Sequence, residues 1–396
     1  MKRMRTLLWV VGLALCWTAP AVAAVDASVV HLRQSCTVGG VVLDDCFETA
    51  AALFDLATGW VWNTRTPSPS ASNPLLVMVG PGTDFGAFAC SGGSHVTVRG
   101  SGREISAFDG AVAIDVTDCD QLAFIDIGAH GEDRAVRWRG AGSSSWSNVE
   151  LRAEGGADPA TLAWDDECTT PGETGQHFVH WARVRTLHAS GSETLVAPVR
   201  TACGELFVYD SELELAAAGG SASLFGGVLN LGGKANLYGT VIRVRATGGL
   251  GSNHMWGVFN TTDAEPAFTM HGGIINVLAA ASPSTDVTGL FNFAGSVDTK
   301  ETAFVMKAGS GGTAYRLSSL LNQNQENVQA PFLWEQGAEP PAIESLDGQD
   351  LFVETDCDGS GCACSTGCDP HLMVYTSTCT GAGGPWFDTV RKQCRN

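Results

Sequence analysis

Short stretches of alternating apolar and polar residues recur along the middle of the chain, each followed by a run of small residues. Examples are Val149-Glu-Leu-Arg, Leu213-Glu-Leu-Ala and Ile242-Arg-Val-Arg. Alternation with period two is typical of β-strands that have one buried and one exposed face. The ends of successive small-residue runs are 35, 29, 29, 33 and 29 positions apart, which indicates an internal repeat.

Aligning the segments places one apolar pair from each repeat at the same position, which predicts a continuous core column. A second feature recurs in phase, because Asn230, Asn260, Asn292 and Asn322 follow apolar pairs at intervals of 30, 32 and 30 residues. We interpret these asparagines as a ladder of side-chain amides that bond between equivalent turns. The predicted inward pairs are Val149/Leu151, Val184/Thr186, Leu213/Leu215, Ile242/Val244, Ile275/Val277 and Phe304/Met306.

Each repeat holds about three short strands separated by Gly, Ser and Asn turns, and it contains no apolar pattern of helix length. A propeller blade usually needs about 40 residues, and leucine-rich repeats have their own leucine spacing, so neither fits. The sequence therefore predicts an all-β fold, a three-sided parallel β-helix of about eight coils. In this solenoid residues about 30 apart lie on neighbouring coils, about 4.8 Å from each other.

The cysteines support this arrangement. Two pairs are separated by 29 and 35 residues, which are also spacings of the repeat. Equivalent positions on adjacent coils bring Cα atoms within the distance that a disulfide requires. A third pair is close in sequence. The predicted disulfides are Cys36–Cys46, Cys90–Cys119 and Cys168–Cys203.

The start of the repetitive region has a characteristic order of elements. Residues 45–48, Asp-Cys-Phe-Glu, look like a capping box that opens a helix over 47–58. A Pro/Ser-rich loop over 64–73 and an apolar strand within 75–85 follow. This order resembles the beginning of secreted right-handed parallel β-helix proteins of the pectin-lyase-like superfamily, in which a helix plugs the open end of the first coil. The resemblance covers roughly 41–334 and implies a right-handed β-helix, but fold alone does not imply an activity.

Residues 1–24 combine a basic start, an apolar stretch over 7–15 and small residues over 21–24, which predicts a secretory signal peptide. A lipid anchor on Cys16 is the alternative. Removing the peptide leaves 12 of the 13 cysteines, and an even number in an exported chain favours disulfides. No later stretch has about 18 uninterrupted apolar residues, so we expect no transmembrane segment. The predicted location is secreted: extracellular, periplasmic or cell surface.

Charge narrows the range of partners. The formal net charge is −19, and it becomes −22 without the three basic residues of the signal peptide. Such a chain repels nucleic-acid phosphates and anionic lipids, so neither is an expected partner. At the same time 44% of the residues are hydrophobic, which is enough for a core and too many for a disordered acidic polymer.

The predicted organisation has five parts. They are a signal peptide over 1–24, an N-terminal cap over 25–74, the parallel β-helix over 75–334, an acidic linker over 335–356 and a disulfide-rich C-terminal module over 357–396. Because the C-terminal module is too short to build much of a hydrophobic core, we expect disulfides to hold it together. A zinc-bound knot is the alternative. Its six cysteines are Cys357, Cys362, Cys364, Cys368, Cys379 and Cys394.

No metal site or cofactor is predicted. Residues 356–360, Asp-Cys-Asp-Gly-Ser, resemble the opening of a calcium-binding loop. However, Gly367 stands at the twelfth position, where such a loop requires a glutamate. Beside the zinc alternative for the C-terminal module, calcium is the ion for which this stretch offers part of a pattern.

The catalytic patterns of related β-helix enzymes are missing at their defining residues. Polygalacturonase-like members carry Asn-Thr-Asp, Asp-Asp and Gly-His-Gly segments, of which only Asp165-Asp166 is present. The Gln-Asp-Thr and Asp-Phe-Ile-Phe segments of pectin methylesterases are absent from the sequence. Pectate-lyase-like members cluster acidic calcium ligands, whereas the outward column predicted here alternates acids with arginines. We interpret that column as a structural charge ladder rather than a glycan groove. Its members are Glu150, Arg185, Glu214, Arg243 and Asn276.

The repeat of 35 residues contains the remaining candidates for catalysis. Asp165, Asp166 and Glu173 are expected on an enlarged loop, where two carboxylates are able to divide acid and base roles. The alternative is that Asp165 and Asp166 cap a turn near the asparagine ladder. His177 and His180 are three apart on a predicted strand and therefore face opposite sides, which makes them poor partners for a metal.

Trp146 and Trp181 are also 35 apart, so we expect them to stack on adjacent coils. Exposed, they form with Arg183 and Arg185 a platform for sugar rings; buried, they are core filling. The leading hypothesis is a non-catalytic binding or structural protein that contacts a polysaccharide or cell-surface glycan. The alternative is a polysaccharide lyase or glycoside hydrolase with its site around residues 165–180. The oligomeric state and the identity of the ligand stay open.

Overall fold

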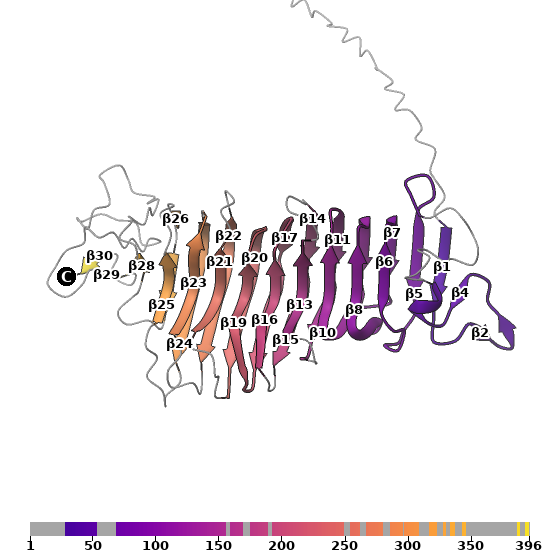
Figure 1. Cartoon of the computed structure of the whole chain (residues 1–396), viewed down its shortest axis with the longest axis horizontal. Coiled ribbons are helices and arrows are strands. Elements are labelled where there is room, and N and C mark those ends of the chain that lie inside the picture. Colours follow the sequence, from indigo (N-terminus) through magenta and orange to yellow (C-terminus); the bar gives the residue numbers. More distant parts are fainter. Residues whose placement is uncertain are drawn as a thin grey trace, which may run out of the picture.

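In the computed structural model of this chain, nearly every described residue belongs to a strand or to a turn between strands (Figure 1). The structure describes residues 28–53, 69–155, 159–168, 175–188, 192–248, 254–261, 267–279, 286–295 and 297–308, and after these only the short strands 317–322, 328–329, 333–336, 343–345, 386–388 and 393–395.

Three ladders of parallel strands run along the molecule, which we call face 1, face 2 and face 3. Face 1 contains β1 (Ser28–Leu32), β5 (Leu75–Val79), β7 (Ser94–Arg99), β9 (Asp120–Ile125), β11 (Ser143–Ser147), β14 (Gln176–His180), β17 (Glu205–Tyr209), the first parts of β20 (Lys234–Ala246), β22 (Phe268–Ala279) and β24 (Val297–Ala308), and β26 (Val328–Gln329). Face 2 contains the first parts of β8 (Ala107–Thr117) and β10 (Gly128–Arg139), then β12 (Glu150–Ala153), β15 (Arg183–His188), β18 (Glu212–Ala217), the second parts of β20, β22 and β24, and β27 (Leu333–Gln336).

Face 3 completes each coil. It contains β6 (Phe88–Ser91), the second parts of β8 and β10, β13 (Ala160–Glu167), β16 (Ser192–Thr201), β19 (Ser221–Asn230), β21 (His254–Thr261), β23 (Asp286–Ala294), β25 (Leu317–Asn322) and β28 (Ile343–Ser345). Among the described strands, only β2 (Thr37–Val38) with β3 (Val41–Val42) and β29 (Trp386–Asp388) with β30 (Gln393–Arg395) pair antiparallel. Parallel pairing of every coil with the next confirms the predicted β-helix.

The register confirms the repeat except at one step. Ile242 lies between Leu213 and Ile275, as predicted. Leu151, however, lies beside Val184, so the first spacing is 33 rather than 35 on faces 1 and 2. The turn that follows face 2 holds two extra residues, and only on face 3 does the spacing reach 35.

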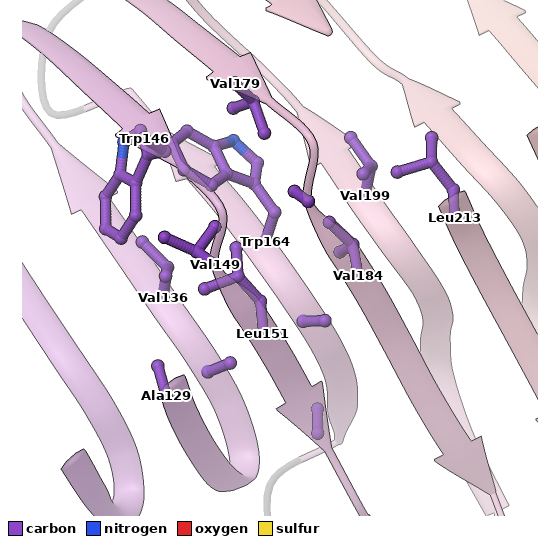
Figure 2. Close-up of a cluster of buried hydrophobic side chains, with 14 of the residues drawn as sticks. Ala129, Val136, Trp146, Val149, Leu151, Trp164, Val179, Val184, Val199 and Leu213 are labelled. Carbon is purple, nitrogen blue, oxygen red and sulfur yellow. The ribbon is translucent and has the colours of Figure 1, made fainter. Parts of the chain in front are cut away.

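The inward side chains of the three faces form one continuous core (Figure 2). Every described member of the predicted inward pairs is buried, including Thr186, whose hydroxyl donates to the Ala197 carbonyl at 2.9 Å. The largest side chains lie in the middle coils, where the Trp146 ring contacts Trp164 edge-on with centroids 5.3 Å apart. Because each coil covers the apolar residues of the previous one, the core needs no second layer of helices.

The predicted asparagine ladder is confirmed at the end of face 3. Asn230 Nδ2 donates to Asn260 Oδ1 at 2.6 Å, and Asn260 Nδ2 donates to Asn292 Oδ1 at 2.7 Å. All three side chains are buried. Thr201 continues the column on the preceding coil and donates to Asn230 Oδ1 at 2.7 Å. The amides therefore satisfy one another along the axis where the chain leaves the strand.

Face 3 bends at the same place in successive coils. Phe225 and Val228 both point into the main core although they are three apart, an odd spacing that a flat strand does not allow. A bulge at the intervening glycines resolves this, and a Cβ atom on Gly227 would lie 2.6 Å from the Gly257 carbonyl oxygen. A second apolar cluster is separate from the main core. It contains Ala160, Leu162, Ala197 and Leu229, with Leu195, Leu224, Leu231 and Phe259 packed against them.

The N-terminal region differs from the prediction in detail. The helix predicted over 47–58 begins later, because Phe47 belongs to β4 (Cys46–Phe47) and α1 spans Ala50–Leu53. Thr49 rather than Asp45 provides the N-cap, accepting from the Ala52 amide at 3.2 Å. The rest of that prediction lies outside the described residues.

All three predicted disulfides form, with Cα–Cα distances of 5.5, 6.3 and 5.5 Å. The six cysteines of the C-terminal module fall outside the described residues, apart from Cys394 in β30. In the part of the chain that the structure describes, no helix has both the length and the apolar character needed to cross a membrane.

Replacing Asn260 by Ala tests the ladder. The substitution leaves buried partners in Asn230 and Asn292 without one of their bonds, so we expect the free energy of unfolding to fall by about 2–4 kcal/mol. Urea denaturation measures it. Asn276→Ala, on the partly exposed outer side of β22, is the matched control and should cost less than about 0.5 kcal/mol. Equal losses in the two variants would contradict a structural role for the ladder.

Candidate functional site

The turn between face 1 and face 2 has the same backbone conformation in six successive coils. One residue of each turn has a positive φ, between 45° and 70°, which is the left-handed region. The register places these residues at equivalent positions, two before the start of each face-2 pairing. In chain order they are Asp126, Asn148, Trp181, Asp210, Gly239 and Gly272.

Trp181 is the exception in this column. Gly, Asn and Asp adopt the left-handed region readily, whereas a bulky side chain there is strained. Trp181 nevertheless has a φ of 53°, and its side chain is 58% exposed. Burial of the indole ring therefore does not offset the strain in the backbone. A strained residue that the fold does not require points to a role outside folding.

A surface pocket of about 390 Å³ lies beside Trp181. Its lining includes the turns at Asp210 and Gly239, the indole ring and charged side chains. The close approach of the two turns excludes a side chain at Gly239, because a Cβ atom there would lie 2.6 Å from Asp210 Oδ1. The lining residues are Arg103, Trp181, Ala182, Arg183, Asp210, Ser211, Glu212, Gly239 and Val241.

One wall of the pocket comes from a distant part of the sequence. Arg103, in the loop between β7 and β8, donates from Nη1 to the Trp181 carbonyl oxygen at 3.1 Å, across 78 residues. Glu104 of the same loop lies 3.7 Å from Arg183. The base of the loop is fixed by Ser106, whose hydroxyl donates to the Gly80 carbonyl at 2.7 Å. The loop thus holds the Trp181 turn from outside the coil.

The charges of the pocket balance. Arg183 and Arg103 contribute two positive charges, and Asp210 and Glu212 two negative ones. Glu212 lies between two arginines, 3.9 Å from Arg183 Nε and in direct contact with Arg243. The contacts of Arg183 at 3.7 and 3.9 Å exceed hydrogen-bond length, so its guanidinium retains donors for a ligand.

A row of stacked rings borders the pocket on face 1. The Tyr209 ring lies parallel to His180 and Tyr238, with centroids 4.6 and 5.0 Å away. His271 ends the row and meets Asp298 Oδ2 at 3.1 Å. Tyr238 and His271 meet edge-on, with ring centroids 5.6 Å apart. At the other end of the row His180 contacts Trp181, with ring planes tilted by 54° and centroids 6.0 Å apart. Trp181, by contrast, is free of ring stacking on its coil neighbours at 148 and 210, which carry Asn and Asp.

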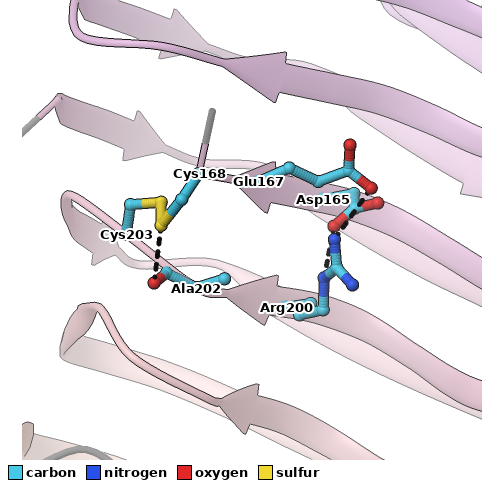
Figure 3. The surroundings of a disulfide bond; sticks show 6 residues. All are labelled: Asp165, Glu167, Cys168, Arg200, Ala202 and Cys203. Carbon is cyan, nitrogen blue, oxygen red and sulfur yellow. Dashed lines mark hydrogen bonds and ion pairs between the residues drawn. A yellow bond between two sulfur atoms is a disulfide. The ribbon is translucent and has the colours of Figure 1, made fainter. Parts of the chain in front are cut away.

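The acidic residues predicted for catalysis lie in β13, so the prediction of an enlarged loop around them is wrong. Asp165 is completely buried, although it points to the outer side of face 3. Arg134 Nε donates to its Oδ2 at 2.6 Å, and Arg200 Nε donates to its Oδ1 at 2.5 Å (Figure 3 shows the Arg200 pair beside Glu167). Burial raises the pKa of Asp165 to about 6, against the arginines, which lower it. A carboxylate covered in this way cannot meet a polysaccharide, which argues against catalysis.

The neighbouring candidates are also unsuited to a site. Asp166 pairs in register with Thr201, one step from Asn230, which agrees with the alternative that it occupies the ladder position. His177 lies in the core, where burial lowers its pKa to about 3. His180 lies on the outer surface, so the two histidines face opposite sides as predicted. Glu173 lies outside the described residues. The described part of the chain contains no group of three His, Cys, Asp or Glu side chains suited to a metal ion.

The predicted tryptophan stack is wrong, because the spacing between their coils is 33. Trp146 lies beside Val179, is fully buried and stacks on Phe124 with centroids 4.0 Å apart. Trp181 instead corresponds to Asn148. Of the predicted ligand-binding residues, Trp181 and Arg183 line the pocket.

The other arginine has a structural role. Arg185 donates from Nε to Glu214 Oε2 at 2.9 Å, which supports the charge-ladder interpretation. At the first step of that ladder the register differs from the prediction, because Glu150 lies beside Arg183 and Arg185 lies beside Arg152. The predicted pair still forms across this offset, with Arg185 Nη1 4.0 Å from Glu150 Oε1. The steps from Arg185 to Glu214 and on to Arg243 are as predicted.

The sequence analysis named only Trp181 and Arg183 among the lining residues of the pocket; the residues that it missed include Arg103, Glu212, Asp210 and Gly239. A signal for the last two exists. Aligning the coils by strand register produces a column of Asp, Asn, Asp and Gly interrupted by one tryptophan. Arg103 carries no such signal, because its contact depends on the path of a loop.

No model of a known protein family matches this sequence, and no curated protein matches it. Among solved structures, the pectin methylesterase from carrot aligns with a TM-score of 0.39 and 10% identity, over 83% of this chain and 88% of its own. The pectin methylesterase from Erwinia chrysanthemi aligns with a TM-score of 0.31 and 9% identity, over 83% of this chain and 93% of its own. Identities of 9–10% do not carry catalytic residues from one chain to another.

The burial of Asp165 predicts a pH dependence of stability. Its pKa is higher in the folded chain, at about 6, than the ordinary 3.8, so the folded state holds the proton more tightly. Its contribution to stability is therefore lost as pH rises from about 4 to about 6. We expect the free energy of unfolding, measured relative to Asp165→Asn, to fall by about 1–3 kcal/mol across that window. A difference that stays constant from pH 4 to pH 7 would contradict the raised pKa.

Proposed function

We propose that this protein is exported and binds a glycan in the pocket beside Trp181 without turning it over. The observation that carries the proposal is an exposed indole held in a strained backbone conformation at the rim of a pocket. Aromatic rings pack against the apolar C–H faces of sugars, while charged and polar groups around them bond to hydroxyls. The three disulfides and the absence of charge attraction for nucleic acid are compatible with an extracellular setting.

The charge of the pocket supports a neutral glycan as the ligand. The two arginines and two carboxylates cancel, so neither a polyanion nor a polycation gains from the site as a whole. A neutral sugar, in contrast, uses both kinds of group, since each hydroxyl donates and accepts. The net charge of −19 further opposes acidic polysaccharides.

Glycoside hydrolysis in the same pocket is the second candidate, because Asp210 and Glu212 both line it. Hydrolysis requires one carboxyl group that holds a proton and one that does not. Glu212 is already engaged in ion pairs with Arg183 and Arg243. Asp210 is then the one acidic residue of the lining outside those ion pairs, and hydrolysis needs two carboxyl groups, so binding is the better supported function.

Removing the indole tests the binding proposal. We expect Trp181→Ala to weaken binding to soluble neutral polysaccharides by at least about tenfold, since the ring supplies the apolar contact. Affinity electrophoresis through gels containing galactomannan, xyloglucan or β-glucan measures the change. Phe293→Ala, which removes another exposed ring far from the pocket, is the matched control and should bind as the unmodified protein does.

The same panel discriminates between the alternatives. Unchanged retention of Trp181→Ala, or stronger retention of the unmodified protein by polygalacturonate than by neutral polymers, would contradict the proposal. Release of new reducing ends that is lost in Asp210→Asn would replace binding by hydrolysis.

Trp181→Asn separates function from folding. Asn148 occupies the same turn position on the neighbouring coil, and asparagine tolerates a positive φ. The mostly exposed indole gives up little buried area, so we expect this variant to be more stable by about 1 kcal/mol while losing glycan binding. Thermal and urea denaturation measure the first effect, and gel retention the second. A variant that loses stability would show that the indole is needed for folding.

A further inference from the structure

A column of aromatic rings runs along the corner between face 1 and the pocket. Each of its four rings directly precedes a residue of the left-handed turns, so the strand register places them at equivalent positions on four neighbouring coils. The Trp181 ring joins one end of the column through its contact with the first of these rings. We call the whole set the ring row: Trp181, His180, Tyr209, Tyr238 and His271.

The ring row is straight, accessible and bounded. Equivalent positions of a β-helix stack along its axis, so the coils from His180 to His271 span about 14 Å in a line at the usual strand spacing. The side chain of Trp181 is exposed, and the other four rings are half-buried. On the coil before His180 the same position holds Ser147, which ends the row on that side.

Other outward side chains of face 1 on these coils have contacts of their own. Glu205 accepts from Gln176 Nε2 at 3.3 Å and from Asn236 Nδ2 at 3.2 Å. The rings of Phe178 and Phe207 stack in parallel with centroids 4.9 Å apart, and they carry no polar atoms. Cross-strand pairs of this kind stabilise the sheet, and that role is enough to account for these side chains.

The two tyrosines of the ring row keep a polar group available. The hydroxyls of Tyr209 and Tyr238 bond to no other residue in the part of the chain that the structure describes, so each is able to donate and accept. Stacking of the two rings, with planes 11° apart, holds the hydroxyls one coil from each other. Stacking itself does not need a hydroxyl, as the Phe178–Phe207 pair shows. The hydroxyls therefore point to a bound partner with polar groups at a similar spacing.

We propose that the ligand is an extended neutral polysaccharide lying along the axis of the β-helix, with one sugar against Trp181 and the next sugars beside Tyr209 and Tyr238. This inference rests on the glycan binding proposed above and adds the length and direction of the bound segment. The lining of the pocket already runs the same way, from Trp181 to Gly239. Those three coils cover about 10 Å at the usual strand spacing, which is more than one sugar ring fills.

The turns give the bound chain its direction. Beyond Asp210 the left-handed positions are Gly239 and Gly272, which have no side chains to obstruct a ligand. On the other side of Trp181, Asn148 Nδ2 donates to Asp126 Oδ1 at 2.7 Å, so these polar groups are already bonded to each other. A polysaccharide that starts at Trp181 therefore extends toward Gly272.

The straight row also selects the shape of the polymer. Sugars that lie beside successive coils must follow one line, because the coils themselves do. Chains of the cellulose and mannan type are extended, whereas chains of the amylose type curl. We therefore expect cello- or manno-oligosaccharides to fit the row, and malto-oligosaccharides to bind through the pocket alone.

Oligosaccharides of different length test the proposal, with the full disulfide-bonded chain and isothermal titration calorimetry. We expect the pentasaccharide of the cellulose or mannan series to bind at least about tenfold more tightly than the disaccharide, because only the longer chain reaches the tyrosines. Tyr238→Phe keeps the stacked ring and removes one hydroxyl. It should weaken binding of the pentasaccharide about three- to tenfold and leave the disaccharide unaffected. Trp181→Ala should weaken both.

Ser147→Ala is the matched control, because it removes a hydroxyl at the same register position on the other side of the Trp181 coil, and it should bind both ligands as the unmodified protein does. Tyr209→Phe replaces Tyr238→Phe if thermal denaturation shows that the latter is misfolded. Equal affinity for both lengths, a tyrosine variant that binds the pentasaccharide normally, or tightest binding of maltopentaose would overturn the extended site while leaving glycan binding at Trp181 in place. Unchanged binding by Trp181→Ala, or no binding of any oligosaccharide, would instead contradict the proposed function and this inference with it.

Discussion

Hydrogen bonding between each coil and the next is the constraint on which this structure depends. Every strand of one coil must present its amides and carbonyls at the positions that the following strand needs, about 4.8 Å along the axis. A change of backbone conformation in one coil therefore has to be repeated in its neighbours. This is why the left-handed turn persists from Asp126 to Gly272, and why the bulge of face 3 recurs at Gly227 and Gly257.

The same constraint separates side chains that serve the fold from those that do not. In a column where every coil has the same backbone, the residues suited to that backbone are predictable, so an unsuited one stands out. Trp181 is such a residue among Asp, Asn and Gly. The apolar outward residues after Arg200 are another case, because a solvated sheet face is normally polar. Trp181 lies on the surface, where the core does not depend on it, whereas Leu229 is buried in the second apolar cluster.

Much of this architecture is predictable from the sequence, because the inward residues and Asn230, Asn260 and Asn292 repeat with the coil. The predicted alignment of neighbouring coils was wrong by two residues at one repeat. Cys168 and Cys203, 35 apart, suggested one spacing for the whole coil, but the extra residues lie only in the turn before face 3. This error of two residues aligned Trp181 with the buried Trp146. The burial of Asp165 between Arg134 and Arg200 was unpredictable for another reason, since it depends on the bend of the strand.

A solenoid also explains how a strained residue is retained at a binding site. Its stability is approximately a sum over coils and the interfaces between them, so strain in one turn is shared only with its neighbours. The turns at Asn148 and Asp210 on either side of Trp181 are unstrained, and their amides bond to the next coil at 3.0 and 2.9 Å. The loop of Arg103 adds a contact to the Trp181 carbonyl at 3.1 Å. With its backbone held on three sides, the indole is kept in place without packing against the core, so that 58% of the residue stays exposed beside the pocket.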